Sequence, residues 1–131
     1  MPDPVEIPAS HADLLTGAHI ASVATIQPDG SPQVSATWVD LQHGLVLVPV
    51  KRTLRKTRNL RRDPRVSVLV VDRDDPGRFI EVRGTAQLVD DPSSMLTARL
   101  WPRYEGEPWP ADDQGSQRLQ CRISPTRVRT S

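Results

Sequence analysis

Apolar and polar positions alternate with a period of two along much of the chain, and this pattern predicts β-strands. Six runs fit a short strand: 19–26, 33–41, 45–50, 65–72, 79–89 and 118–123. A Pro-Asp-Gly turn joins the first two runs into a hairpin. Gly84 inside the fifth run indicates a bulge or a close backbone approach, and Pro49 in the third indicates an edge position or a bulge.

Three segments have the composition and end signals of short helices. They are 11–17, with Ser10 as N-cap, Asp13 at the capping-box position and Gly17 as the stop; 53–62, with Thr53 as N-cap; and 93–101, which follows Asp91 as N-cap and Pro92. Residues 1–8 are expected to be an extended lead-in and residues 126–131 a C-terminal tail. The order of the elements predicts a mainly β (α+β) single domain over residues 1–131, an antiparallel sheet closed into a small barrel.

Composition removes several classes of function. Cys121 is the only cysteine, so neither an intrachain disulfide nor a Cys/His zinc cluster can form, and no metal site is expected. The three histidines are scattered, without a nucleophile motif beside them, and no catalytic acid–base group is predicted. The chain has neither a signal-peptide pattern nor a run of about 18 apolar residues, so we expect a cytoplasmic protein with no membrane partner.

Positive charge is concentrated in one stretch. Residues 51–65, "KRTLRKTRNLRRDPR", hold eight of the seventeen cationic side chains and a single acid, Asp63. This stretch has three possible interpretations: a solvated helix face, a nucleic-acid-binding surface, or a binding site for a phosphorylated small molecule. Residues 51–65 contain no aromatic side chain on which a base could stack, and the sequence shows no helix-turn-helix motif. No nucleic-acid partner is therefore expected. A helix N-terminus beside Lys51, Arg52 and Arg55 favours the phosphate of a small molecule.

Three segments, "ASVATIQPDGSPQVSATWVD", "KTRNLRRDPRVSVLVVD" and "VRGTAQLVDD", carry a resemblance to a known family. The chain resembles the pyridoxamine phosphate oxidase-like, FMN-binding split-barrel oxidoreductases, and is most similar to the actinobacterial branch that uses the deazaflavin coenzyme F420. The resemblance implies a six-stranded antiparallel split β-barrel with about three short helices, and a homodimer with cofactor sites along the subunit interface. It implies hydride transfer between reduced F420 and a planar conjugated small-molecule substrate. An FMN-dependent oxidoreductase or oxidase and a non-catalytic cofactor-binding module are the alternatives.

The resemblance also implies which residues bind the cofactor. Lys56 and Asn59 match positions that hold its phosphate-bearing chain, with further phosphate contacts at Lys51, Arg52, Thr53 and Arg55, whereas Gln33, Ser35 and Thr37 match the strand that lines the ring. Leu54 stands where family members commonly have a basic residue, and Arg52 is the preferred substitute. Arg58, Arg61, Arg62 and Arg65 are candidates for contacts to the cofactor tail or for surface salt bridges. Trp101, Tyr104 and Trp109 either pack over the barrel mouth or line a planar substrate pocket.

Overall fold

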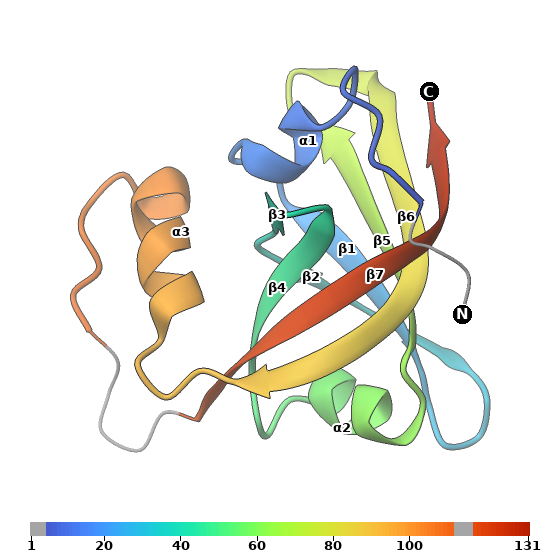
Figure 1. Cartoon of the computed structure of the whole chain (residues 1–131), viewed down its shortest axis with the longest axis vertical. Coiled ribbons are helices and arrows are strands. Elements are labelled where there is room, and N and C mark those ends of the chain that lie inside the picture. Colours follow the sequence, from blue (N-terminus) through green and yellow to red (C-terminus); the bar gives the residue numbers. More distant parts are fainter. Residues whose placement is uncertain (1–4, 112–116) are drawn as a thin grey trace.

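The structure, a computed structural model, describes residues 5–111 and 117–131, and its centre is one antiparallel sheet rolled into a barrel (Figure 1). The strands are β1 (Ala21–Ile26), β2 (Pro32–Thr37), β3 (Asp40–Gln42), β4 (Leu45–Lys51), β5 (Arg65–Asp72), β6 (Asp75–Asp90) and β7 (Arg118–Thr130). The helices are α1 (Asp13–Thr16), α2 (Arg55–Arg62) and α3 (Met95–Glu105). The strand order is β2-β1-β5-β6-β7-β4-β3. The predicted mainly β class is confirmed.

The described sheet has seven strands where the sequence predicts six, because the run 33–41 divides into β2 and β3. Between them the backbone turns away, and the amide of Val39 donates a hydrogen bond to the Tyr104 hydroxyl (3.1 Å). The predicted C-terminal tail at 126–131 is wrong, since β7 continues to Thr130 against β6. The strand passes Pro125 at a bulge of β7: Arg83 and Gly84 of β6 lie opposite Arg127 and Pro125, so Thr126 is the extra residue.

Gly84 marks that bulge, as predicted, because the β6–β7 register shifts between Arg83 and Gly84. A Cβ atom at Gly84 would lie 2.2 Å from the Ser124 carbonyl oxygen, so any side chain would collide with the neighbouring backbone. Pro49 lies at an edge position of the sheet, one of the two positions predicted for it. Among the described strands, β3 pairs only with the 45–47 part of β4, so that side of the sheet is open at Pro49.

All three predicted helix N-caps are wrong in position. Ser10 does not cap α1, whose N-cap position is Ala12; the Ser10 hydroxyl bonds to the His11 ring instead (2.8 Å). Thr53 does not cap α2, because the helix begins two residues later with Leu54 at the extended N-cap position. The third, Asp91, is not at the predicted N-cap position, which Ser94 occupies before Met95, but its carboxylate does accept hydrogen bonds from the amides of Met95 and Leu96.

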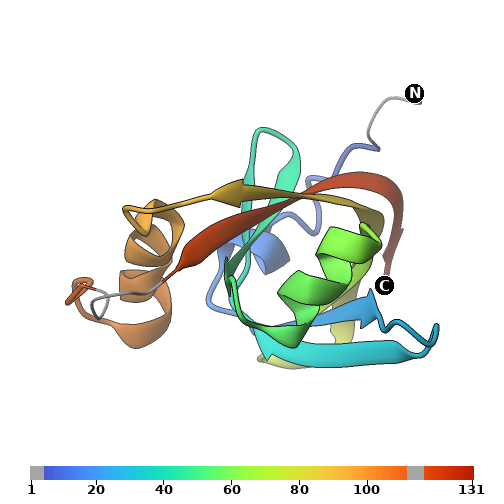
Figure 2. The same cartoon turned by 90° about the horizontal axis from the view of Figure 1, so that it is seen from below.

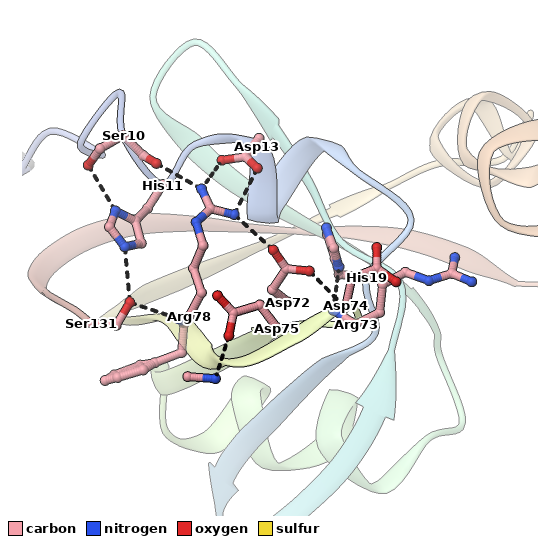
Figure 3. Close-up of polar contacts among 12 residues, drawn as sticks. Ser10, His11, Asp13, His19, Asp72, Arg73, Asp74, Asp75, Arg78 and Ser131 are labelled. Atoms are coloured by element: carbon pink, nitrogen blue, oxygen red, sulfur yellow. Dashed lines mark hydrogen bonds and ion pairs between the residues drawn. The ribbon is translucent and has the colours of Figure 1, made fainter.

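A polar cluster ties the N-terminal segment to the sheet (Figure 3). Arg78 on β6 pairs with Asp13 of α1 and Asp72 of β5, and donates to the Ser10 carbonyl oxygen (2.8 Å). His11 contacts Ser131 at the opposite end of the chain (3.1 Å). These contacts explain why α1 closes one end of the barrel although it is only four residues long.

The helices occupy three different places around the barrel. Figures 1 and 2 show α2 across the end opposite α1, whereas α3 stands to one side. A small apolar cluster of Leu47, Leu96 and Leu100 joins α3 to β4. Within residues 5–111 and 117–131, no helix has the length and apolar character needed to cross a membrane.

Candidate functional site

The connection between β4 and α2 presents the predicted phosphate-binding cations to the surface. Lys51, Arg52, Thr53 and Arg55 are all exposed. The Thr57 hydroxyl donates to the Lys51 carbonyl oxygen (2.6 Å) and fixes the entry into the helix. Arg52 lies before α2 rather than on it, and its guanidinium pairs with Asp90 (2.7 Å). Three exposed cations, Lys51, Arg52 and Arg55, therefore lie on or beside one turn that the Thr57 hydrogen bond anchors.

Lys56 has the opposite environment, because α2 turns it towards the barrel. The side chain is 7% exposed, and its burial lowers the pKa of the ammonium group. Burial also raises the pKa of Cys121, a core residue, to about 12, so this thiol offers Lys56 no negative charge at neutral pH. No acidic side chain pairs with Lys56 in the part of the chain that the structure describes. An unpaired buried cation costs stability, and an anionic ligand would offset that cost.

Asn59 is fully buried and connects α2 with the first hairpin. Its amide nitrogen donates to the Thr25 hydroxyl (3.0 Å) and to Gln27 Oε1 (3.2 Å), and Thr25 in turn donates to Gln33 Oε1 (3.0 Å). Its amide oxygen has no hydrogen-bond partner among the described residues. Asn59 is thus placed to hold the hairpin, while a direct contact with the cofactor stays a prediction.

The predicted ring-binding residues share one face of β2. Gln33, Ser35 and Thr37 are half-buried, whereas Val34 and Ala36 between them are exposed on the other face. The Ser35 hydroxyl is buried and makes no hydrogen bond with any described residue. Asn59 Oδ1 is a second buried polar atom without a hydrogen-bond partner among the described residues, and Lys56, on the same helix as Asn59, is a buried cation. These residues fit a polar, anionic cofactor.

The aromatic residues near α3 form one cluster. Trp38 stacks on Tyr104 (centroids 4.9 Å apart) and meets Trp101 edge-on (5.6 Å), and Trp101 contacts Trp109 (4.8 Å). The Tyr104 hydroxyl donates to the His19 carbonyl oxygen (2.7 Å), so this residue anchors α3 to the barrel. Trp101 also lines a cavity that includes Thr37. The packing interpretation therefore holds for Tyr104, and Trp101 is placed for both roles.

The other arginines of the basic stretch differ in their surroundings. Arg58 and Arg61 are exposed, Arg62 donates to the Ile26 carbonyl oxygen, and Arg65 pairs with Asp63 (2.7 Å). Hydrogen bonds from Arg65 lower the pKa of Asp63 to about 2. Arg62 and Arg65 thus make local surface contacts. No group of three or more histidine, cysteine or acidic residues within the described ranges could hold a metal ion.

Sequence reasoning missed two residues near this site. Asp40, 2% exposed, pairs with Arg99 and Arg103 of α3 and fixes that helix beside the barrel. Arg118 lies directly opposite Lys51 in the β4–β7 ladder and lines the same cavity as Trp101. Sequence pattern alone offered no signal for either, because both depend on pairing between distant segments.

Comparisons with known proteins agree with this architecture. A family model described as "Pyridoxamine 5'-phosphate oxidase" matches residues 7–131. Among solved structures, the chain is similar to an F420 reductase, with 30% identity and a TM-score of 0.86 over 94% of this chain and 98% of the other. It is similar to the conserved hypothetical protein Rv2991 from Mycobacterium tuberculosis, with 32% identity and a TM-score of 0.77 over 99% and 87%. A putative pyridoxamine 5'-phosphate oxidase from Listeria innocua is 28% identical, with a TM-score of 0.63 over 85% and 86%.

Proposed function

The chain belongs to the pyridoxamine 5'-phosphate oxidase family, and from that premise we propose that it is an F420-dependent oxidoreductase. It transfers a hydride between reduced deazaflavin and a planar conjugated small molecule. The similarity to an F420 reductase over nearly the full length of both chains supports this assignment. The observation that carries it is a cationic turn leading into α2, whose Asn59 is linked through Thr25 to Gln33 on a polar β2 face where the Ser35 hydroxyl lacks a partner among described residues.

In this proposal the exposed cations bind the anionic chain of the cofactor. Lys51, Arg52 and Arg55 form charge-assisted hydrogen bonds with its phosphate and with the carboxylates of its glutamate tail. Asp90 competes with these anions for Arg52, so binding requires that pair to open. Because the pair is exposed, opening it costs little free energy.

The inner residues position the ring. Asn59 fixes Thr25, and Thr25 fixes Gln33, so the polar face of β2 is held rigidly before a ligand arrives. Gln33, Ser35 and Thr37 then supply the hydrogen-bonding groups that face the ring. When bound, the deazaflavin would supply the hydride, and the chain's own residues would bind and orient it.

FMN is the alternative cofactor for the same fold. A single terminal phosphate would need fewer cations than Lys51, Arg52 and Arg55 at the β4–α2 turn provide, which favours the longer, more acidic tail of F420. A non-catalytic module that only carries the cofactor would use the same binding residues. Oxidation of the reduced cofactor by an acceptor, catalysed by the protein, would distinguish an enzyme from such a carrier.

We also propose that the protein is a homodimer. The outer face of β2, β1 and β5 has exposed apolar side chains, including Val34 (63% exposed), Leu69 (38%) and Val71 (38%); Val34 pairs with Ala24 and Leu69 with Ser22 in the register. A second copy would cover this face. Light scattering should give twice the chain mass, and Val34→Lys should shift the protein towards monomer. A wild-type monomer at high micromolar concentration would rule the dimer out.

The proposed reaction is tested by mixing the protein with reduced F420 and a panel of conjugated acceptors without oxygen. Reappearance of the oxidised deazaflavin absorbance, dependent on both protein and acceptor, is the expected result. Arg52→Gln should lower F420 affinity about ten-fold or more, since a charge-assisted contact contributes about 1.5–3 kcal/mol. Arg58→Gln is the matched control and should change affinity little. Tight F420 binding with no turnover for any acceptor would favour the carrier.

A further inference from the structure

A cavity of about 510 Å³ lies between the α1–β1 connection, the β5–β6 turn and α3. Much of its wall is apolar, because Ala18, Ile20 and Val71 contribute aliphatic side chains and Tyr104 contributes a ring. Ile20 is 54% exposed and Val71 is 38% exposed. Apolar side chains that stay open to solvent beside a cavity favour a ligand with an apolar body that covers them.

Arg73 gives the same cavity a cation that is free to bind a ligand. It is an exposed residue of the β5–β6 turn and lines the cavity. Its backbone amide donates to His19 Nδ1 (3.1 Å), but its guanidinium forms neither a hydrogen bond nor an ion pair with any residue in 5–111 or 117–131. Figure 3 shows this side chain extended away from Asp72 and Asp75. A planar guanidinium in this position can donate two parallel hydrogen bonds to a carboxylate.

The other two charged residues of the wall already have partners. Asp72 pairs with Arg78 (3.1 Å). Arg103 pairs with Asp40 (3.1 Å), which also pairs with Arg99, so the α3 side of the cavity has an excess of one positive charge. An anionic head group between α3 and the β5–β6 turn therefore meets positive charge on both sides.

The acidic residues around Arg73 limit the charge of that head group. Asp72 and Asp75 flank the β5–β6 turn, and Asp74 lies within it. Their negative charges oppose a dianion, such as a phosphate monoester, more strongly than a monoanion. A carboxylate, with one charge and a shape that matches the guanidinium, is the better ligand.

His19 joins two sides of the cavity. Its ring nitrogen Nδ1 accepts the Arg73 amide, and its carbonyl oxygen accepts the Tyr104 hydroxyl (2.7 Å). The β5–β6 turn and α3 are thus held at a fixed spacing before a ligand arrives. A cavity that is already formed loses less conformational entropy on binding.

We propose that this cavity binds an amphipathic monocarboxylate, whose carboxylate pairs with Arg73 and whose apolar body packs on Ile20 and Val71. The site does not rest on the proposed function, because no residue that lines it is a predicted cofactor ligand. Val71 also belongs to the face proposed for the dimer, so the cavity lies at the edge of that face. The ligand is therefore tested on the whole protein in its native oligomeric state.

Titration of isotope-labelled protein with octanoate, followed by amide chemical shifts in NMR spectra, tests the site. Octanoate should cause saturable shifts at Ile20, Val71 and Arg73 in the millimolar range. It should bind at least about three-fold more tightly than octanamide, which has the same tail without the charge. It should bind at least about ten-fold more tightly than acetate, which has the charge without the tail. Octyl phosphate, the dianion with the same tail, should bind no more tightly than octanoate.

Three variants separate the roles of the wall residues. Arg73→Gln should remove the preference for octanoate over octanamide. Ile20→Ser should weaken the binding of both probes, because part of the apolar wall is lost. Arg127→Gln removes an exposed arginine that does not line the cavity, and this control should keep the full preference. Both replaced wall residues are exposed, and the amide spectrum of each variant reports whether it is folded.

Several results would overturn the proposal. They are the absence of saturable shifts with octanoate, shifts confined to other parts of the protein, and equal affinity of the wild-type protein for octanoate and octanamide. An unchanged preference in Arg73→Gln would overturn it as well. Tighter binding of octyl phosphate than of octanoate would refute the assignment of a monocarboxylate.

Discussion

Replacing Lys56 with methionine should make the cofactor-free protein more stable and at the same time weaken its binding of F420. Lys56 is 7% exposed as a residue, and no acidic side chain among the described residues pairs with its ammonium group. A buried polar group without a partner costs about 1–3 kcal/mol, and methionine fills a similar volume without that cost. We therefore expect the free energy of unfolding to rise by about 1–3 kcal/mol.

The dependence of stability on pH gives a second signature of the same residue. Burial lowers the pKa of Lys56 below its ordinary value of 10.5, so the folded protein releases this proton at a lower pH than the unfolded chain does. Between the two pKa values the unfolded state binds more protons, and the free energy of unfolding rises with pH. Lys56→Met should remove this alkaline rise.

Urea unfolding at neutral and alkaline pH measures the gain in stability and its dependence on pH. F420 titration of the same samples measures the loss of cofactor affinity. Arg58→Met is the matched control, because it removes an exposed cation from the same helix. A clear loss of stability in Lys56→Met would refute the reasoning about burial. A gain in stability with unchanged F420 affinity would show that the buried cation does not serve the cofactor.

Three further predictions concern the framework of the site. Gly84→Ala should destabilise the protein by about 3 kcal/mol or more in urea unfolding, because the new methyl group would collide with the Ser124 carbonyl oxygen, whereas Gly77→Ala should be tolerated. Tyr104→Phe should lower the unfolding free energy by about 1–3 kcal/mol, since the amide of the buried Val39 and the carbonyl oxygen of the half-buried His19 lose their partner; an unchanged value would contradict the anchoring role. The wild-type protein should lose stability as the pH falls from 3.8 towards about 2, because Asp63 takes up a proton there and no longer pairs with Arg65. Asp63→Asn should remove this part of the loss, and an acid unfolding profile identical to that of the wild type would refute the assignment.

The sequence was a good guide wherever a period of two decides the outcome. The alternation along 33–37 predicts that Gln33, Ser35 and Thr37 share a face, and the structure confirms that shared face. Gly84 could also be predicted, because a glycine in the middle of a long strand run has few structural roles other than a bulge or a close approach.

The sequence was a poor guide to which face of the basic helix is buried. Its charge pattern predicts polar groups that meet water or a ligand, yet Lys56, Asn59 and Leu60 all turn towards the barrel end. The helix starts at Arg55, so Arg52 lies before the helix and does not share a helix face with Lys56. This face is buried because α2 packs over the end of the barrel. The position of the helix in the tertiary structure cannot be predicted from the local sequence pattern.

Arg118 was missed for a related reason. Its position opposite Lys51 follows from the register of β7 against β4, two strands that are far apart in the chain. Register is set by the whole sheet, including the bulge at Gly84, and not by the residues that flank Arg118.

Titration of the purified protein with F420, followed by fluorescence and run beside an identical titration with FMN, tests the central claim most directly. We predict saturable binding of F420 that is tighter than binding of FMN and that weakens in Arg52→Gln. Tighter binding of FMN, or no saturable binding of F420, would contradict the account.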